Sequence, residues 1–103
     1  MTILVKEGYL LDFGAWNREI AKLLAEYDNI YILSEQQWQI IFFIRDYFHD
    51  FKRIPSIFKI CGATGLTTID ICRLFPRGPV RSAARIAGVP SSFCTGPPVL
   101  DNP

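Results

Sequence analysis

The sequence predicts a mainly α-helical protein, a small helical bundle with an N-terminal β-hairpin and a C-terminal arm. Three observations predict this fold class. Apolar side chains recur at helical spacing through most of the chain, capping and breaking residues divide it into segments, and the period is lost near the end. A chain of 103 residues, half of them apolar, is the size of one domain with one core. We therefore expect a helical domain over residues 1–90 and an arm over residues 91–103.

The N-terminal elements are a hairpin and a first helix. Two short apolar segments, Thr2–Val5 and Tyr9–Leu11, flank a turn in which Gly8 supplies the backbone conformation. Asp12 is a candidate N-cap for the first helix, whose apolar positions begin at Trp16.

The later helix boundaries carry residue types with known positional preferences. Serine and threonine favour the position before the first turn, proline the first turn, and glycine or proline the end. Start signals are Ser34 with Gln37 for a long, largely buried second helix, Pro55 for a third, Thr67 with Asp70 for a fourth and Pro79 for a fifth. End signals are Gly62 and Gly65 for the third helix, Pro76 for the fourth, and Gly88 and Pro90 for the fifth. The fifth has small inner residues, Ala83, Ala84 and Ala87, which permit close packing.

Composition excludes several classes of protein. The longest uninterrupted apolar stretch is Ile40–Ile44, and no signal peptide pattern opens the chain, so we expect no membrane insertion. Cys61, Cys72 and Cys94 lie in no CxxC or Cys/His pattern, which argues against a disulfide framework and a structural metal. We expect a cytoplasmic protein without cofactor or metal ion.

The thiols are the candidate chemical groups. His49 is the only histidine and is expected near a helix end without a chemical role. Cys61 and Cys72 lie at helical spacing from apolar neighbours, so we expect both to be buried packing residues. Cys94 stands on the arm outside any apolar pattern, where its thiol could reach another protein's active site. An incidental tail cysteine is the alternative.

Basic side chains concentrate in the second half of the chain. Residues 1–50 hold four basic and eight acidic side chains, whereas residues 51–103 hold seven and two. Arg81 and Arg85 are expected to share the outward face of the last helix, where they could stabilise a thiolate or persulfide on Cys94. A solvated face whose cations complement the helix dipole explains the same spacing.

The C-terminal third resembles the DsrC/TusE family, whose signature reads LFPxGPxxxACxxAGLPxPxGC. The matching segments are Leu74–Pro79 and Ala83–Pro90, followed by a tail cysteine. Upstream segments with family counterparts in the same order are Gly8–Leu10, Asp12–Trp16, Leu33–Trp38 and Phe43–Phe48. The resemblance implies a helix-turn-helix-like element in the bundle, and a C-terminal arm whose cysteine accepts and delivers sulfur.

The resemblance also implies partners. TusE-like members take a persulfide from TusBCD-like relay proteins and pass it toward a tRNA thiouridylase, whereas DsrC-like members work through two arm cysteines with sulfite reductase and DsrEFH-like proteins. Cys94 would then be the persulfide-carrying residue of a carrier rather than of a classical enzyme, with Arg81 and Arg85 as electrostatic support.

The chain departs from the family pattern in ways that keep alternatives open. The position of the upstream arm cysteine is Ala84, and Cys94 follows Pro90 by four positions instead of five. Ser92 replaces the second proline, and Thr95–Pro103 continue beyond the cysteine. The alternatives are a regulatory protein that binds nucleic acid through the helix-turn-helix-like element, and a docking subunit that carries no sulfur.

Overall fold

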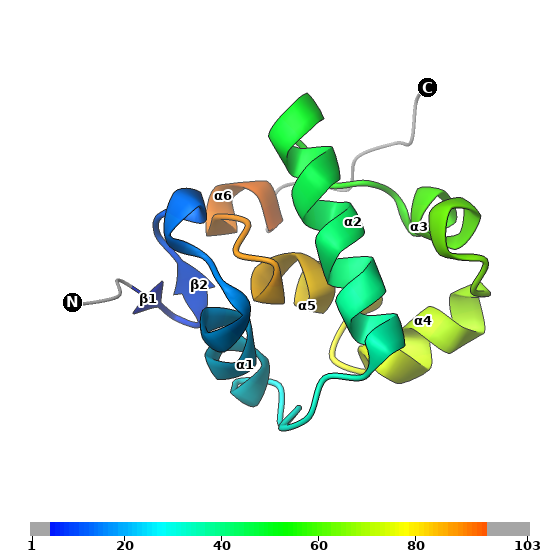
Figure 1. Cartoon of the computed structure of the whole chain (residues 1–103), viewed down its shortest axis with the longest axis horizontal. Helices are drawn as coiled ribbons and strands as arrows, with labels where there is room; N and C mark the ends of the chain where they lie inside the picture. Colours follow the sequence, from blue (N-terminus) through cyan, green and yellow to red (C-terminus); the bar gives the residue numbers. More distant parts are fainter. Residues whose placement is uncertain (1–4, 95–103) are drawn as a thin grey trace.

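A computed structural model of the chain describes residues 5–94, which form a helical bundle with one short hairpin (Figure 1). The predicted fold class is confirmed. The elements in chain order are β1 (Val5–Lys6), β2 (Tyr9–Leu10), the 3-10 helix η1 (Phe13–Ala15), α1 (Arg18–Glu26), α2 (Glu35–Phe51), α3 (Ile57–Thr64), α4 (Thr68–Leu74), α5 (Pro79–Ile86) and α6 (Ser91–Cys94). The expected strand residues Thr2–Leu4 and the arm beyond Cys94 lie outside the described residues.

The hairpin is antiparallel and is closed by a tight two-residue turn. Val5 pairs with Leu10 across the two strands. Glu7 and Gly8 both have positive φ, 55° and 83°, as the favoured two-residue hairpin turns require. The predicted role of Gly8 is confirmed.

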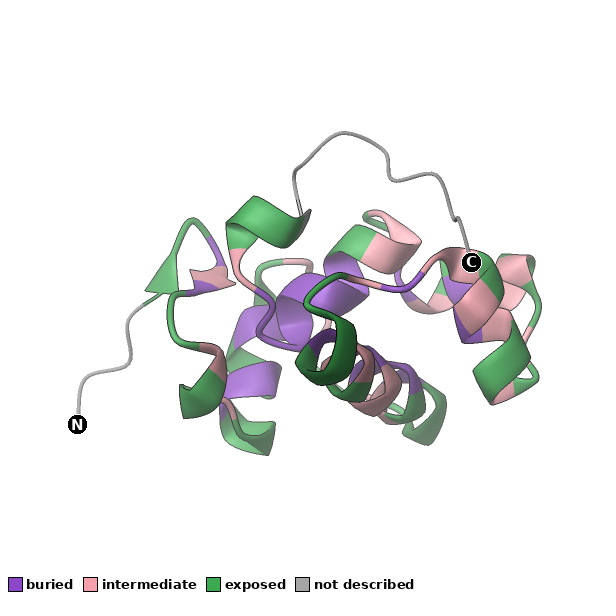
Figure 2. Cartoon of the chain, turned by 90° about the horizontal axis from the view of Figure 1, so that it is seen from above, coloured by how far each residue is buried: buried purple, intermediate pink, exposed green. Residues whose placement is uncertain are grey.

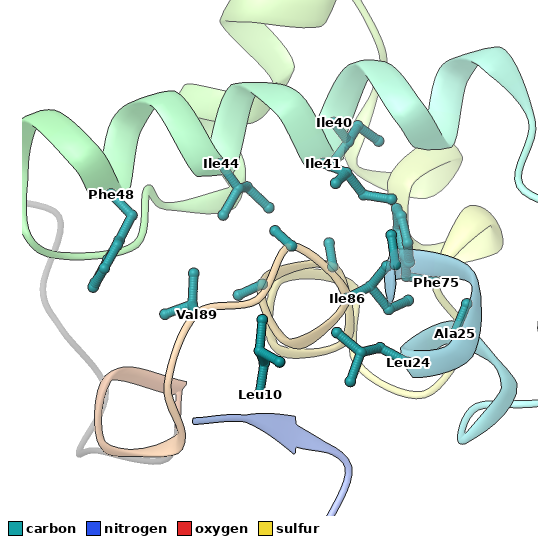
Figure 3. Packing of buried hydrophobic residues seen from close by; sticks show 14 of the residues in the cluster. Leu10, Leu24, Ala25, Ile40, Ile41, Ile44, Phe48, Phe75, Ile86 and Val89 are labelled. Carbon is teal, nitrogen blue, oxygen red and sulfur yellow. The ribbon is translucent and has the colours of Figure 1, made fainter. Parts of the chain in front are cut away.

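Helix α5 lies at the centre of the molecule and packs against α1, α2, α4 and β2 (Figures 1 and 2). In the close view, Ile41 and Ile44 of α2 approach α5 from one side and Leu10 of β2 from the other (Figure 3). The small residues predicted for the inner face of α5, Ala83, Ala84 and Ala87, are fully buried. Alanine at these positions lets neighbouring backbones approach closely.

Most predicted helix boundaries are confirmed. Both capping boxes are formed, Ser34 with Gln37 and Thr67 with Asp70, and Gly65 ends α3 in the left-handed conformation at φ 77°. Only three residues, 65–67, separate α3 from α4, which make up the expected helix-turn-helix-like pair. Within the described part of the chain, no helix has the length and apolar character needed to cross a membrane.

Boundaries predicted for two helices are wrong. Asp12 caps η1 by accepting a hydrogen bond from the Gly14 amide, and the extended backbone of Trp16 then separates η1 from α1. The N-cap of α1 is Asn17. At the third helix the N-cap is Ser56, so Pro55 precedes the helix, and Gly62 lies inside it.

Candidate functional site

The chain leaves the core for its C-terminal segment through a fully hydrogen-bonded helix end. Gly88, at φ 85°, follows α5. The Val89 amide donates to the Ala84 carbonyl and the Gly88 amide to the Arg85 carbonyl, both at 3.0 Å. This pair of bonds is the Schellman motif. Val89 is itself fully buried, so the direction in which the arm leaves α5 is determined by the core.

Two side chains from other elements bind the remaining carbonyls of this helix end. Trp16 Nε1 donates to the Ile86 carbonyl at 2.8 Å, and Arg45 Nη1 donates to the Ala87 carbonyl at 2.8 Å. The last carbonyls of a helix have no partner within the helix, and here all four are satisfied. We call residues 84–90, with the side chains of Trp16 and Arg45, the arm base.

Arg45 is held between aromatic rings at the arm base. Its guanidinium carbon lies 3.9 Å from the ring centre of Phe13 and 4.3 Å from that of Trp16. Burial lowers the pKa of Arg45, and the charge of neighbouring Asp46 partly offsets this effect. The arginine stays a cation, and a cation at a helix C-terminus complements the helix dipole.

An aromatic contact fixes the first turn of the arm. The ring of Phe93, in α6, packs edge-on against Phe48 of α2 with 4.8 Å between ring centres, and Phe48 in turn lies 5.0 Å from Phe13. From the sequence we expected the arm over residues 91–103 to lack the helical period. That expectation is wrong for residues 91–94, because α6 forms a short helix that contacts α2 through Phe93.

The predicted site residue, Cys94, is the last residue of α6 and follows Phe93 directly. The structure describes its backbone, and its side chain lies outside the described atoms. The chain therefore contacts the core up to the residue immediately before this thiol, through the ring of Phe93, which is 44% exposed. Whether residues 91–103 act as a separate arm stays a prediction.

The other two thiols lie in different environments. Cys61 is partly buried and packs against the core, but Cys72 is exposed, so its assignment as a packing residue is wrong. The spacing from Ile69 suggested a buried face, yet Ile69 is itself 62% exposed, and Ile71 is the buried residue of α4. His49 is exposed in the last turn of α2, as predicted.

Comparisons with known proteins decide the family. Residues 2–95 match the family described as DsrC like protein. The chain belongs to this DsrC-like family.

Its relatives carry names from sulfur metabolism. The chain is 36% identical to sulfurtransferase TusE of Buchnera aphidicola subsp. Acyrthosiphon pisum over 91 residues, covering 82% of this chain and 79% of the relative. It is 33% identical to sulfurtransferase TusE of Escherichia coli K12, covering 82% and 83%.

Solved structures agree with this family assignment. The oxidised gamma-subunit of the dissimilatory sulfite reductase (DsrC) from Archaeoglobus fulgidus superposes with a TM-score of 0.73 at 33% identity, covering 85% of this chain and 87% of that one. The structure of dissimilatory sulfite reductase I (DsrI) contains a chain that superposes with a TM-score of 0.78 at 31% identity, covering 85% and 86%.

The two arginines predicted to support Cys94 occupy different environments in this DsrC-like chain. Arg81 is exposed, as expected, but Arg85 is only 6% exposed, so its predicted outward position is wrong. Arg85 donates to the carbonyls of Gly8 and Leu24 and forms an ion pair with Asp28. Arg85 follows Arg81 by four residues, which is about 40° more than one full helical turn. Here this rotation is sufficient to place the Arg85 side chain in the interior. An electrostatic effect of either arginine on Cys94 stays a prediction.

The residues that build the arm base were not predicted from the sequence. Trp16 and Arg45 lie 70 and 42 positions from the carbonyls that they bind, so no local pattern links them to α5. Phe93 was assigned to an unstructured arm. The one available signal was that Phe93 is an aromatic residue in an otherwise polar segment. Aromatic side chains bury a large apolar area, so such a residue often marks a packing contact.

The described residues contain no cluster of candidate metal ligands. Between residues 5 and 94, no three histidine, cysteine, aspartate or glutamate side chains gather in a group that could hold one.

Proposed function

We propose that this DsrC-like protein carries sulfur as a persulfide on Cys94, between a donor and an acceptor protein. The observation that carries the proposal is the position of Cys94 directly after the Phe93 contact with Phe48. A carrier thiol must be presented at a defined place while remaining free to enter a partner. The arm base and Phe93 supply the defined place, and the thiol is the next side chain along.

The transfer needs only thiol chemistry. The Cys94 thiolate attacks the outer sulfur of a donor persulfide, a new S–S bond forms on Cys94, and the donor leaves as a thiolate. In delivery, an acceptor thiolate attacks the outer sulfur of the Cys94 persulfide, and Cys94 returns to a thiolate. No external oxidant or reductant is consumed in either step.

We further propose a single-thiol mechanism. Ala84 stands at the position of the family's upstream arm cysteine, and it is fully buried in the core. A disulfide between two arm cysteines is therefore not available to this chain. This favours a TusE-like relay toward tRNA thiolation in a reducing cytosol over a DsrC-like role with sulfite reductase, with TusBCD-like donors and a thiouridylase-like acceptor as the partners.

The helix-turn-helix-like pair gives weaker support to the nucleic-acid alternative. Phosphate contacts by lysine and arginine dominate affinity for nucleic acids. Helix α4 has one arginine, Arg73, together with Asp70, and the pair exposes the apolar side chains of Phe58 and Ile69. Such a surface is better suited to contact with a protein.

The test is sulfur loading followed by mass spectrometry. Because Cys72 is exposed, polysulfide is expected to modify it nonspecifically, so the experiment starts from a Cys72→Ser background. That protein should gain the mass of one sulfur atom, removable by reductant, and the added Cys94→Ser change should abolish the gain. Transfer from a persulfide-loaded donor protein is measured in the same way. Equal loading of the protein without Cys94 would contradict the proposal.

A supporting measurement concerns Arg81. If its charge stabilises the Cys94 thiolate, Arg81→Gln should slow alkylation of Cys94 at neutral pH, whereas Arg73→Gln serves as the control. An unchanged rate would remove Arg81 from the site and leave the carrier proposal standing.

A further inference from the structure

A pocket of about 280 Å³ lies between the hairpin, the end of α1 and the start of α5. Its lining includes Arg77, Arg81 and Arg85, together with Asp28 and Glu7. None of the described residues that line it is a cysteine.

The buried part of the pocket is already neutralised. Asp28 pairs with the guanidinium of Arg85 and accepts a hydrogen bond from the Ser82 hydroxyl. Arg85 and Ser82 are 6% and 3% exposed, so this network is buried, and its opposite charges balance each other. Asp28 therefore presents no uncompensated negative charge to a ligand.

The exposed part of the pocket has an excess of positive charge. Arg77 and Arg81 are exposed, and among residues 5–94 their side chains form no hydrogen bond or ion pair. Among the described lining residues, Glu7 is the one acidic side chain besides Asp28. The exposed part of the lining therefore carries two guanidinium groups and one carboxylate.

We propose that this pocket binds a phosphate-type oxyanion through Arg77 and Arg81. Guanidinium groups donate two parallel hydrogen bonds to such oxyanions, and these charge-assisted bonds are stronger than neutral ones. A phosphate dianion has enough oxygens and charge to engage both arginines, whereas a carboxylate has two oxygens and one charge. The exposed ring of Tyr27, which lies 5.7 Å from the Arg85 guanidinium carbon, adds a phenolic donor to the same lining.

Glu7 also lines the pocket and contributes negative charge to it. Glu7 lies in the hairpin turn next to Gly8. A Cβ on Gly8 would lie only 3.2–3.3 Å from side-chain atoms of Arg85 and Tyr27, so glycine leaves room for these two side chains. The turn thereby brings the Glu7 backbone to the pocket. Removing the negative charge of Glu7 strengthens binding of an anion, whereas it would weaken binding of a cation.

The oxyanion could be free phosphate or a phosphate of a nucleic-acid backbone, which share this chemistry. The test is a titration of isotope-labelled protein, followed by NMR, with inorganic phosphate and separately with a short single-stranded RNA, at low salt. The variants are Arg77→Gln, Arg81→Gln and Glu7→Gln. Arg73→Gln is the matched control, because Arg73 is exposed and lies outside the pocket lining, and its replacement removes the same charge.

We expect phosphate to shift the signals of the pocket residues, with binding about tenfold weaker in Arg77→Gln and in Arg81→Gln. Glu7→Gln should bind several-fold more tightly, and Arg73→Gln should be unchanged. If the affinity for RNA is higher than that for phosphate, and the variants rank in the same order, the pocket binds a nucleic-acid phosphate. If the two affinities are comparable, the pocket binds the free ion. Equal weakening by Arg73→Gln, or binding of a polyglutamate peptide but of neither phosphate ligand, would overturn the proposal.

Discussion

Asp28 and Arg85 form an ion pair inside the protein, with 13% and 7% of their side-chain surfaces exposed. They are separated by 57 positions in the sequence and join the end of α1 to α5. Arg85 also donates to the Gly8 carbonyl of the hairpin turn at 3.0 Å. One guanidinium therefore connects the hairpin, α1 and the central helix.

Breaking this pair should destabilise the fold. Asp28→Ala leaves the Arg85 charge buried without its partner, and such changes cost about 3–5 kcal/mol in free energy of unfolding. Urea denaturation measures the loss. Arg81→Ala, which removes an exposed arginine of the same helix, should change stability by less than about 0.5 kcal/mol. Equal effects of the two substitutions would show that the pair does not hold these three elements together.

Gly88 should be intolerant of a side chain, in contrast to Gly62. At Gly88 φ is 85°, and a Cβ would lie 2.8 Å from Trp16 Cδ1, so Gly88→Ala should cost about 3 kcal/mol. Gly62 lies inside α3 with nothing within 4 Å of a Cβ, so Gly62→Ala should stabilise the protein by about 0.5–1 kcal/mol. Thermal and urea unfolding of both variants check the prediction, which fails if Gly88→Ala is as stable as the unmodified protein.

The Phe93 contact should control the order of α6. Aromatic pairs of this geometry contribute about 0.5–1.5 kcal/mol beyond area burial, so Phe93→Ala should open the turn more often. The readout is hydrogen exchange at the amide of position 93, which donates to the Pro90 carbonyl at 3.0 Å. Its exchange should be several-fold faster, while exchange within α2 stays unchanged. Phe58→Ala, at a 71% exposed ring, is the control and should leave α6 exchange as it was.

The N-terminus of α4 should weaken in acid. Hydrogen bonds from the Thr67 amide and then the Thr67 hydroxyl lower the pKa of Asp70 below its ordinary 3.8. Because the folded-state pKa is depressed, the stabilisation is complete above the unfolded-state value and is lost as pH falls through the lower folded-state value. NMR titration should show the Thr67 amide losing protection in that window. The Ser34–Gln37 box of α2 contains no titrating side chain, so the Ser34 amide should not follow.

Local patterns in the sequence were sufficient for most helix ends. The two capping boxes, the Gly65 and Gly88 terminations and the Gly8 turn depend on residues within about four positions of one another. The hydrogen bonds of each feature form when its own short segment becomes helical or makes its turn, and they do not depend on the surrounding tertiary structure. The apolar period of α2 and the small residues of α5 likewise depend on helix geometry alone.

The candidate site was predicted in part. The sequence alone, with its family resemblance, pointed to Cys94, and the family assignment is now shown by the comparisons. From the sequence we placed Arg85 on the surface and Cys72 in the core, and both placements were wrong. Helical spacing gives the directions of side chains relative to one another, but it does not say which direction faces the core.

The sequence by itself determined the helical class, the hairpin turn and most helix boundaries, because these arise from hydrogen bonds and steric preferences between near neighbours. Only the tertiary structure decided the pairing of Asp28 with Arg85, the binding of the α5 carbonyls by Trp16 and Arg45, and the contact of Phe93 with Phe48. Each of these contacts joins residues more than 40 positions apart, and their partners are selected by how the whole core packs, which no short segment encodes.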